Sequence, residues 1–218
     1  MMQALIDACA NPQAISLSFQ FFANNGVDAF QDRPVIEQFT HSHNPDLWCA
    51  ETAIEVKTLV RKDFPLQYFG AHRPFFRAKL AKEKRPRWTD GSGRSVQQAF
   101  LMAANTGRIR KFPAGGARRF ATLNHYALRS LDSYLVKNDR GDVNRENRAF
   151  DLTYWRERND AAYEDRSIQR YLPDLKQALS ALKADPEIKA AHEYCVRVVL
   201  PLYFATELND LSAGNRGT

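Results

Sequence analysis

The sequence predicts a mainly α fold with a helical, bundle-like body. Three observations support it. Apolar side chains recur at three- and four-residue spacing over residues 117–137, Pro173 and Pro186 stand where proline opens helices, and residues 144–170 are rich in charge. A short β-hairpin near the N-terminus is the one departure from this fold that the pattern allows. We expect a single domain over residues 1–218, ending in a disordered tail at 212–218.

The N-terminal part carries the strand signal. Ile15, Leu17, Phe19 and Phe21 alternate with polar residues, which is the period of a strand with one buried face. The turn-forming sequence Asn24-Asn25-Gly26 follows. A strand that ends at this turn is the basis for the predicted hairpin.

Proline, glycine and capping residues divide the rest of the chain into expected helices. The first runs from the cap sequence Asn44-Pro45-Asp46 to Lys62. The others cover residues 74–84, 94–105 after a glycine-rich loop at 89–93, 117–137, the charged stretch 144–170, 173–183, and 186–209 with a kink at Pro201.

Composition excludes several classes of protein. The 14 Phe, 8 Tyr and 3 Trp residues are too many for a disordered chain. The most apolar stretch, residues 195–205, contains Arg197 and Pro201 and is too short for a membrane span, and no signal-peptide pattern opens the sequence. Three widely spaced cysteines suit a reducing cytoplasm and no zinc cage. We therefore expect a cytoplasmic protein with no membrane partner.

Positive charge is concentrated in the middle of the chain. The net charge is +6, from 31 basic and 25 acidic residues, but residues 72–120 contain 13 basic residues and 2 acidic ones. Such a local excess repels itself unless a polyanion neutralises it. The sequence therefore predicts a nucleic-acid-binding protein, for DNA or RNA, without catalytic activity of its own and without a cofactor. The acidic flanks suit other protein subunits of a larger nucleoprotein complex.

The expected contacts with nucleic acid are the cations of this segment, one later arginine and one aromatic ring. Aromatic residues alternate with the charges and offer faces for base stacking. The predicted binding residues are Arg73, Arg77, Lys79, Lys82, Lys84, Arg85, Arg87, Trp88, Arg94, Arg108, Arg110, Lys111, Arg118, Arg119 and Arg129. A protein-interaction module that binds an acidic partner is an alternative with the same charge.

Two short patterns suggest catalysis instead. The first is Pro45-Asp46 followed by Glu55-Val56-Lys57, which resembles the signature of PD-(D/E)xK nucleases. The resemblance implies a metal-dependent nuclease in which two acidic residues on adjoining strands hold a divalent cation and the lysine helps to activate water. On the helix expected over this region, however, Asp46 and Glu55 would point to opposite sides.

The second pattern is Arg118-Arg119 followed by His125, which resembles the arginine–histidine motif of HEPN ribonucleases. The resemblance implies general acid–base catalysis by His125 and charge stabilisation by Arg119. Phe120 stands where that family prefers a polar residue. Neither His41 with His43 nor His192 with Cys195 has the companions that a metal site requires, so no metal ligand is predicted and enzymatic activity stays open.

Overall fold

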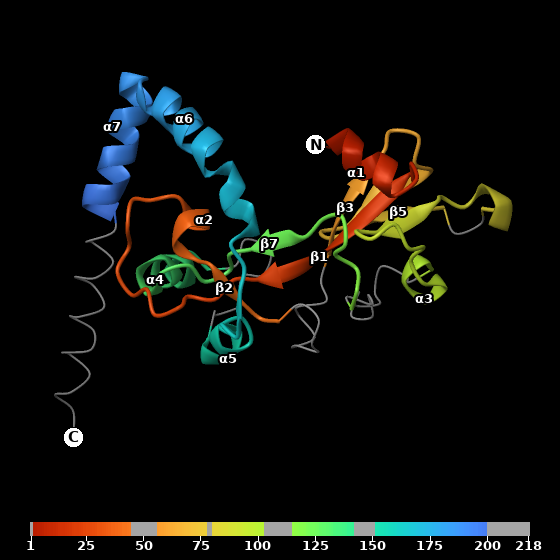
Figure 1. Ribbon diagram of the computed structural model, residues 1–218, viewed down its shortest axis with the longest axis horizontal. Helices are drawn as coiled ribbons and strands as arrows, with labels where there is room; N and C mark the ends of the chain where they lie inside the picture. Colours follow the sequence, from red (N-terminus) through yellow and green to blue (C-terminus); the bar gives the residue numbers. More distant parts are fainter. Residues whose placement is uncertain (1, 45–55, 78–79, 103–114, 142–150, 200–218) are drawn as a thin grey trace. The chain divides into compact units, whose positions relative to one another are not determined.

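The computed structural model describes residues 2–44, 56–77, 80–102, 115–141 and 151–199 (Figure 1). The strands are β1 (Ala14–Phe21), β2 (His41–Ser42), β3 (Val56–Val60), β4 (Leu66–Phe69), β5 (Pro74–Phe76), β6 (Trp88–Asp90), β7 (Leu123–His125) and β8 (Tyr163–Glu164). The helices are α1 (Met2–Ala8), α2 (Val35–Gln38), α3 (Gln98–Leu101), α4 (Leu131–Arg140), α5 (Leu152–Arg156), α6 (Leu172–Lys183) and α7 (Pro186–Tyr194). Short 3-10 helices at Lys82–Lys84 and Ser167–Tyr171 and a π-helix at Cys195–Val199 complete the elements.

The fold is a mixture of α and β structure. The described residues contain both helices and strands, and these strands form one mixed sheet of four and two sheets of two. The prediction of a mainly α, bundle-like protein is therefore wrong. The cause is that several strands depend on pairing between segments far apart in the sequence, which local periodicity does not reveal.

Strand β1 organises the four-stranded sheet. It pairs antiparallel with β3, parallel with β6 through its first three residues, and parallel with β7 through its last three (Figure 1). Seven of its eight residues are buried, so both faces of the strand are covered. The buried Ser16 hydroxyl of this strand lies 2.9 Å from the Thr58 hydroxyl and accepts a 2.9 Å hydrogen bond from the Trp88 indole.

The expected N-terminal strand is confirmed by β1, but the hairpin is not formed. Asn25 and Gly26 do make the predicted turn, each with positive φ, at 54° and 74°. The chain then leaves the sheet, and β1 takes β3, β6 and β7 as its partners instead. The turn signal was therefore correct, while the strand expected after it was not.

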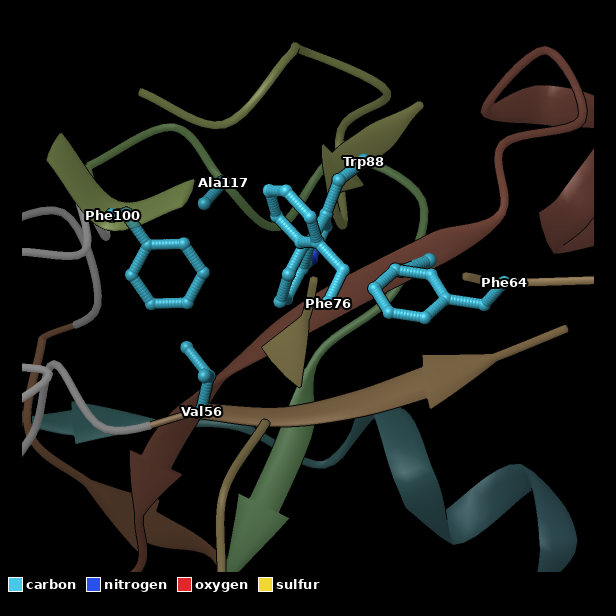
Figure 2. Close-up of a cluster of buried hydrophobic side chains, with 7 residues drawn as sticks. Val56, Phe64, Phe76, Trp88, Phe100 and Ala117 are labelled. Atoms are coloured by element: carbon cyan, nitrogen blue, oxygen red, sulfur yellow. The ribbon is translucent and has the colours of Figure 1, made fainter. Parts of the chain in front are cut away.

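The core of this sheet is aromatic. Figure 2 shows Trp88 between Phe64 and Phe100, with ring centroids 5.7 and 5.5 Å from that of Trp88 and interplanar angles near 90°. Phe76 and Val56 complete the cluster from β5 and β3. Edge-to-face packing of this kind stabilises a core beyond the burial of ring area alone. The cluster holds together β5 and β6, the strands on either side of the basic stretch at residues 77–87.

Four of the expected helices differ from the structure over the described residues. Residues 56–60 and 74–76 are the strands β3 and β5, and the expected helix over 94–105 is reduced to α3 in the described residues. Over 117–137, residues 123–125 form β7 on β1, and the helix begins only at Leu131. Ser130 starts it by accepting a hydrogen bond from the Ser133 amide.

The last two helices agree better with the sequence. Helix α6 covers the expected residues 173–183 with Pro173 in its first turn, and Asp185 caps α7 just before Pro186 as predicted. The single long helix that residues 144–170 suggested is replaced by α5, β8 and a 3-10 turn over the described part. The expected continuation from residue 200 to 209 and the disordered tail at 212–218 lie outside the described residues.

The chain divides into two compact units. Unit 1 consists of residues 1–21 and 42–125, and unit 2 of residues 22–41 and 126–218. Each unit is therefore built from two separate stretches of sequence. Among the residues that the structure describes, every helix is too short or too polar to cross a lipid bilayer.

Candidate nucleic-acid interface

The charge separates between the two units. Unit 1 contains 16 basic and 7 acidic residues, a balance of +9, and unit 2 contains 15 basic and 18 acidic residues, a balance of −3. The whole positive excess of the sequence therefore belongs to one structural unit. This makes unit 1 the part of the protein suited to a polyanion.

Arg73, the first predicted contact, is part of the core. Its side chain is buried, and its guanidinium lies 4.8, 4.9 and 4.4 Å from the ring centroids of Phe75, Trp88 and Phe100. It also donates hydrogen bonds to the carbonyl oxygens of Phe100 and Leu101, in α3. Burial lowers the pKa of Arg73 to about 10. Both Arg73 and Trp88 serve packing in this structure and face no solvent.

Two turns of unit 1 form a rigid pair, which we call the paired turns: residues 90–94 and residues 115–121. The Asp90 carboxylate, almost completely buried, organises the first turn. It accepts hydrogen bonds from the amides of Ser92 and Arg94, at 2.8 and 3.0 Å, and its other oxygen lies 2.7 Å from Arg94 Nε. The Ser92 and Arg94 amides of this glycine-rich loop therefore donate to a carboxylate of the protein itself. In a phosphate-binding loop, such amides donate to the phosphate.

Four hydrogen bonds join the first turn to the second. The Ser92 hydroxyl donates to the Gly116 carbonyl at 2.6 Å and accepts from the Arg119 amide at 2.9 Å. Arg94 Nη2 donates to the Gly115 carbonyl at 2.8 Å, and the Phe120 amide donates to the Gly91 carbonyl at 3.0 Å. The backbone of residues 119 and 120 is therefore fixed by the loop at 90–94.

Glycine is required where the two turns approach each other. A Cβ atom on Gly91 would lie 2.7 Å from each of two carbonyl oxygens, those of Ala117 and Ala121. Gly116 has a positive φ of 67°, and a Cβ atom there would lie 3.2 Å from an Arg94 nitrogen. The close approach leaves the second turn little freedom to move.

The paired turns present a cation and an aromatic ring to solvent side by side. Arg119 is exposed, Phe120 is 41% exposed, and the Arg119 guanidinium lies 5.2 Å from the centre of the Phe120 ring. Exposed cation–aromatic pairs of this kind can bind a phosphate and stack on a base at the same time. Arg94 is also exposed at the first turn, although Asp90 already neutralises it.

A second basic stretch connects β5 to β6. Arg77, Lys82, Lys84 and Arg87 are exposed there, the two lysines on a 3-10 turn where Glu83 is the acidic residue between them. Arg87 also donates to the Ala10 carbonyl. These four side chains are exposed, whereas Arg85 is only half-exposed.

The other predicted contacts are dispersed or outside the described residues. Arg118 is half-buried and donates to the Phe19 carbonyl at 2.9 Å. Arg129 is exposed but belongs to unit 2, where its φ of 62° marks a turn. Lys79, Arg108, Arg110 and Lys111 lie outside the described residues.

Of the residues in the nuclease-like pattern, the structure describes Val56 and Lys57. Lys57 is on β3, and its Nζ donates to the Ala71 carbonyl at 2.6 Å. Asp46 and Glu55 lie outside the described residues. The expected helix, which would have set the two acidic residues on opposite sides, is wrong from residue 56 onwards because Val56 begins a strand.

The pattern of Arg119 and His125 also takes a different form from the expected shared helix. Arg119 is in the second of the paired turns and His125 ends β7. His125 is half-buried and packs edge-on against Phe19, with ring centroids 4.5 Å apart. In the described part of the chain, no group of three or more His, Cys, Asp or Glu residues could hold a metal ion.

The sequence analysis did not select Phe120, Asp90 or Ser92 as site residues. The glycine-rich sequence at residues 90–93 signalled a turn, but the partner of that turn lies more than twenty residues later. Comparisons of the chain with protein-family models, with curated proteins and with solved structures found no match.

Proposed function

We propose that this protein binds nucleic acid through unit 1 and is a subunit of a larger nucleoprotein complex. The observation that carries the proposal is the balance of +9 in unit 1 against −3 in unit 2. Cations gathered on one unit release counterions from a phosphate backbone, which is the main source of affinity in such complexes. The proposed contacts are Arg77, Lys82, Lys84, Arg87, Arg94 and Arg119 among the described residues, and Lys79, Arg108, Arg110 and Lys111 from the sequence. Arg73 and Trp88 are left out because they are buried.

Unit 2 supports the protein-partner part of the proposal. Helices α6 and α7 contain no buried residue, and Leu182, Ile188 and Tyr194 are 54, 44 and 56% exposed. Large apolar side chains exposed on two consecutive helices are typical of surfaces that bind other proteins. The cysteines in the described part of the chain, Cys9 and Cys195, are both free, which fits the proposed location in a reducing cytoplasm.

The test compares two triple variants with the same net charge. Lys82→Gln, Lys84→Gln and Arg119→Gln remove three cations from unit 1, and Arg140→Gln, Arg156→Gln and Lys189→Gln remove three exposed cations from unit 2. Affinity for labelled DNA and RNA is measured by fluorescence anisotropy over a range of salt. We expect wild-type binding to weaken steeply with salt, and only the unit 1 variant to lose affinity and salt dependence.

Two results would contradict the proposal. One is the absence of binding to any nucleic acid at low salt. The other is an equal loss of affinity in both triple variants, which would show that only the net charge of the chain matters. The ultraviolet absorbance spectrum of the protein purified at low salt is an independent test of binding. Nucleic acid that stays bound during purification increases the absorbance at the wavelength where the bases absorb.

A metal-dependent nuclease of the PD-(D/E)xK type is the second candidate. The observation that favours it is the position of Lys57 on strand β3, as the motif requires, two residues after Glu55. The test is cleavage of labelled DNA and RNA with Mg²⁺ or Mn²⁺ by the wild type and by Glu55→Ala. Metal-dependent cleavage that the variant lacks would establish this function, and its absence in the wild type would exclude it.

A further inference from the structure

We propose that the paired turns select single-stranded nucleic acid, with Phe120 stacking on an unpaired base and Arg119 binding the adjoining phosphate. This inference rests on the proposed function of unit 1 and adds to it the kind of strand that is bound. It depends on the exposure of Phe120, the cation beside it and the rigidity of the backbone beneath both.

Phe120 is an aromatic ring kept at the surface. It is 41% exposed, although the same unit buries Phe64, Phe76, Trp88 and Phe100 in its core. A base in a duplex is already stacked on both faces, so an exposed ring gains a partner only from a base that is unpaired. Phe120 therefore offers an interaction that single strands can use and duplexes cannot.

The position of Phe120 is fixed before any ligand arrives. Its amide bonds to the Gly91 carbonyl at 3.0 Å, and the amide of Arg119 bonds to the Ser92 hydroxyl at 2.9 Å. The first turn is itself held by the buried Asp90 carboxylate. A ring on such a backbone loses little conformational entropy when a base stacks on it.

Arg119 supplies the charge at the same place. Its guanidinium lies 5.2 Å from the centre of the Phe120 ring and is exposed to solvent. Consecutive bases and phosphates of an extended strand alternate along the chain. A cation next to an exposed ring matches that alternation, and the excess of +9 in unit 1 favours a polyanion over other ligands of the ring.

The test measures affinity for a labelled oligothymidylate and for a duplex of the same length by fluorescence anisotropy. We expect the wild type to bind the single strand more tightly. Phe120→Leu, which keeps an apolar side chain but removes the ring, should weaken binding to the single strand by about tenfold and leave duplex binding unchanged. Phe120→Trp, which keeps a ring, should retain the preference.

Phe69→Leu is the matched control. Phe69 is an even more exposed ring in the same unit, at 65%, but lies on β4 outside the paired turns. We expect this variant to bind both ligands as the wild type does. Arg119→Gln should weaken binding to both ligands, because a phosphate contact does not distinguish them. Thermal unfolding of each variant shows whether the fold is kept, and all affinities are compared at a temperature at which every variant is folded.

The failure of this inference and the failure of the proposed function are distinguishable. Equal affinity of the wild type for both ligands, or an unchanged preference in Phe120→Leu, would overturn the stacking role while leaving nucleic-acid binding in place. Equal losses in Phe69→Leu and Phe120→Leu would also overturn it, because the effect would then belong to exposed rings in general. No binding of either ligand would contradict the proposed function itself.

Discussion

The carboxylate of Asp90 lies 2.7 Å from Nε of Arg94 and also holds the amides of Ser92 and Arg94 within the turn. One buried acidic group therefore both shapes the loop and compensates a cation of a strongly basic segment. Asp90 is one of only two acidic residues between positions 72 and 120, and the other is Glu83.

Removal of the Asp90 carboxylate should destabilise the protein. In Asp90→Ala, two turn amides lose their acceptor and Arg94 loses its counter-charge, so we expect the free energy of unfolding to fall by about 3 kcal/mol. Urea denaturation measures the change. Asp63→Ala is the control, because the exposed ion pair of Asp63 with Arg61 should contribute less than about 1 kcal/mol. Equal effects in the two variants would show that Asp90 does not organise the turn.

The close approach of the paired turns should be sensitive to one added methyl group. Gly91→Ala would bring a Cβ atom within 2.7 Å of two carbonyl oxygens, and we expect a loss of about 2 kcal/mol of stability from overpacking. Gly115→Ala is the matched control, since no atom lies within 4 Å of its added Cβ. A Gly91→Ala variant as stable as Gly115→Ala, measured by thermal unfolding, would contradict the packing of the two turns.

Arg73 should contribute to stability and not to binding. Arg73→Met removes the donors to the carbonyl oxygens of Phe100 and Leu101 and the cation inside the aromatic cluster. We expect a loss of about 3 kcal/mol in unfolding free energy, with unchanged nucleic-acid affinity at a temperature where the variant is folded. The exposed Arg77→Met should give the opposite pattern, with stability unchanged and affinity reduced. A reduced affinity of folded Arg73→Met would place this arginine at the interface.

A fall in pH should weaken the contact of the Asp32 carboxylate with His192 of α7 and Lys183 of α6. The hydrogen bond from His192 lowers the pKa of Asp32 below its ordinary value of 3.8, with a smaller contribution from Lys183. A carboxyl group whose pKa is lower in the folded state stabilises the protein above its unfolded pKa. That stabilisation is lost as pH falls through the folded value.

The measurement for Asp32 is the free energy of unfolding as a function of pH. We expect the wild type to exceed Asp32→Asn near neutral pH by less than about 1 kcal/mol, because the side chain is 47% exposed. The difference should shrink below pH 4. Curves that stay parallel down to strongly acidic pH would mean that Asp32 contributes no linked proton.

The elements that the sequence predicted well have local causes. Asp185 and Pro186 start α7 through a side-chain cap and a fixed φ angle, and both effects act within four residues. The strands β3 and β7 could not be predicted in this way. Their residues become strands because β1 pairs with them, and the periodicity of residues 117–137 gives no sign of that partner.

Some features of the candidate site could also be predicted from the sequence, and others could not. The excess of cations in residues 72–120 is visible in the sequence, and the structure assigns it to one unit. Burial of Arg73 is not visible, because the rings around it come from positions 75, 88 and 100. The partnership of Phe120 with Gly91 likewise spans 29 positions and needs the fold to appear.

The central place of β1 has a consequence for how the protein is made. Each of the three other strands in its sheet pairs with β1, and β7 is about one hundred residues further along the chain. During synthesis the first strand leaves the ribosome long before its last partner, so the sheet closes late and the chain folds slowly. A fragment that begins at residue 42 would contain β3, β6 and β7 without the strand that joins them. A separately supplied peptide of residues 1–21 is then the natural candidate to restore the sheet.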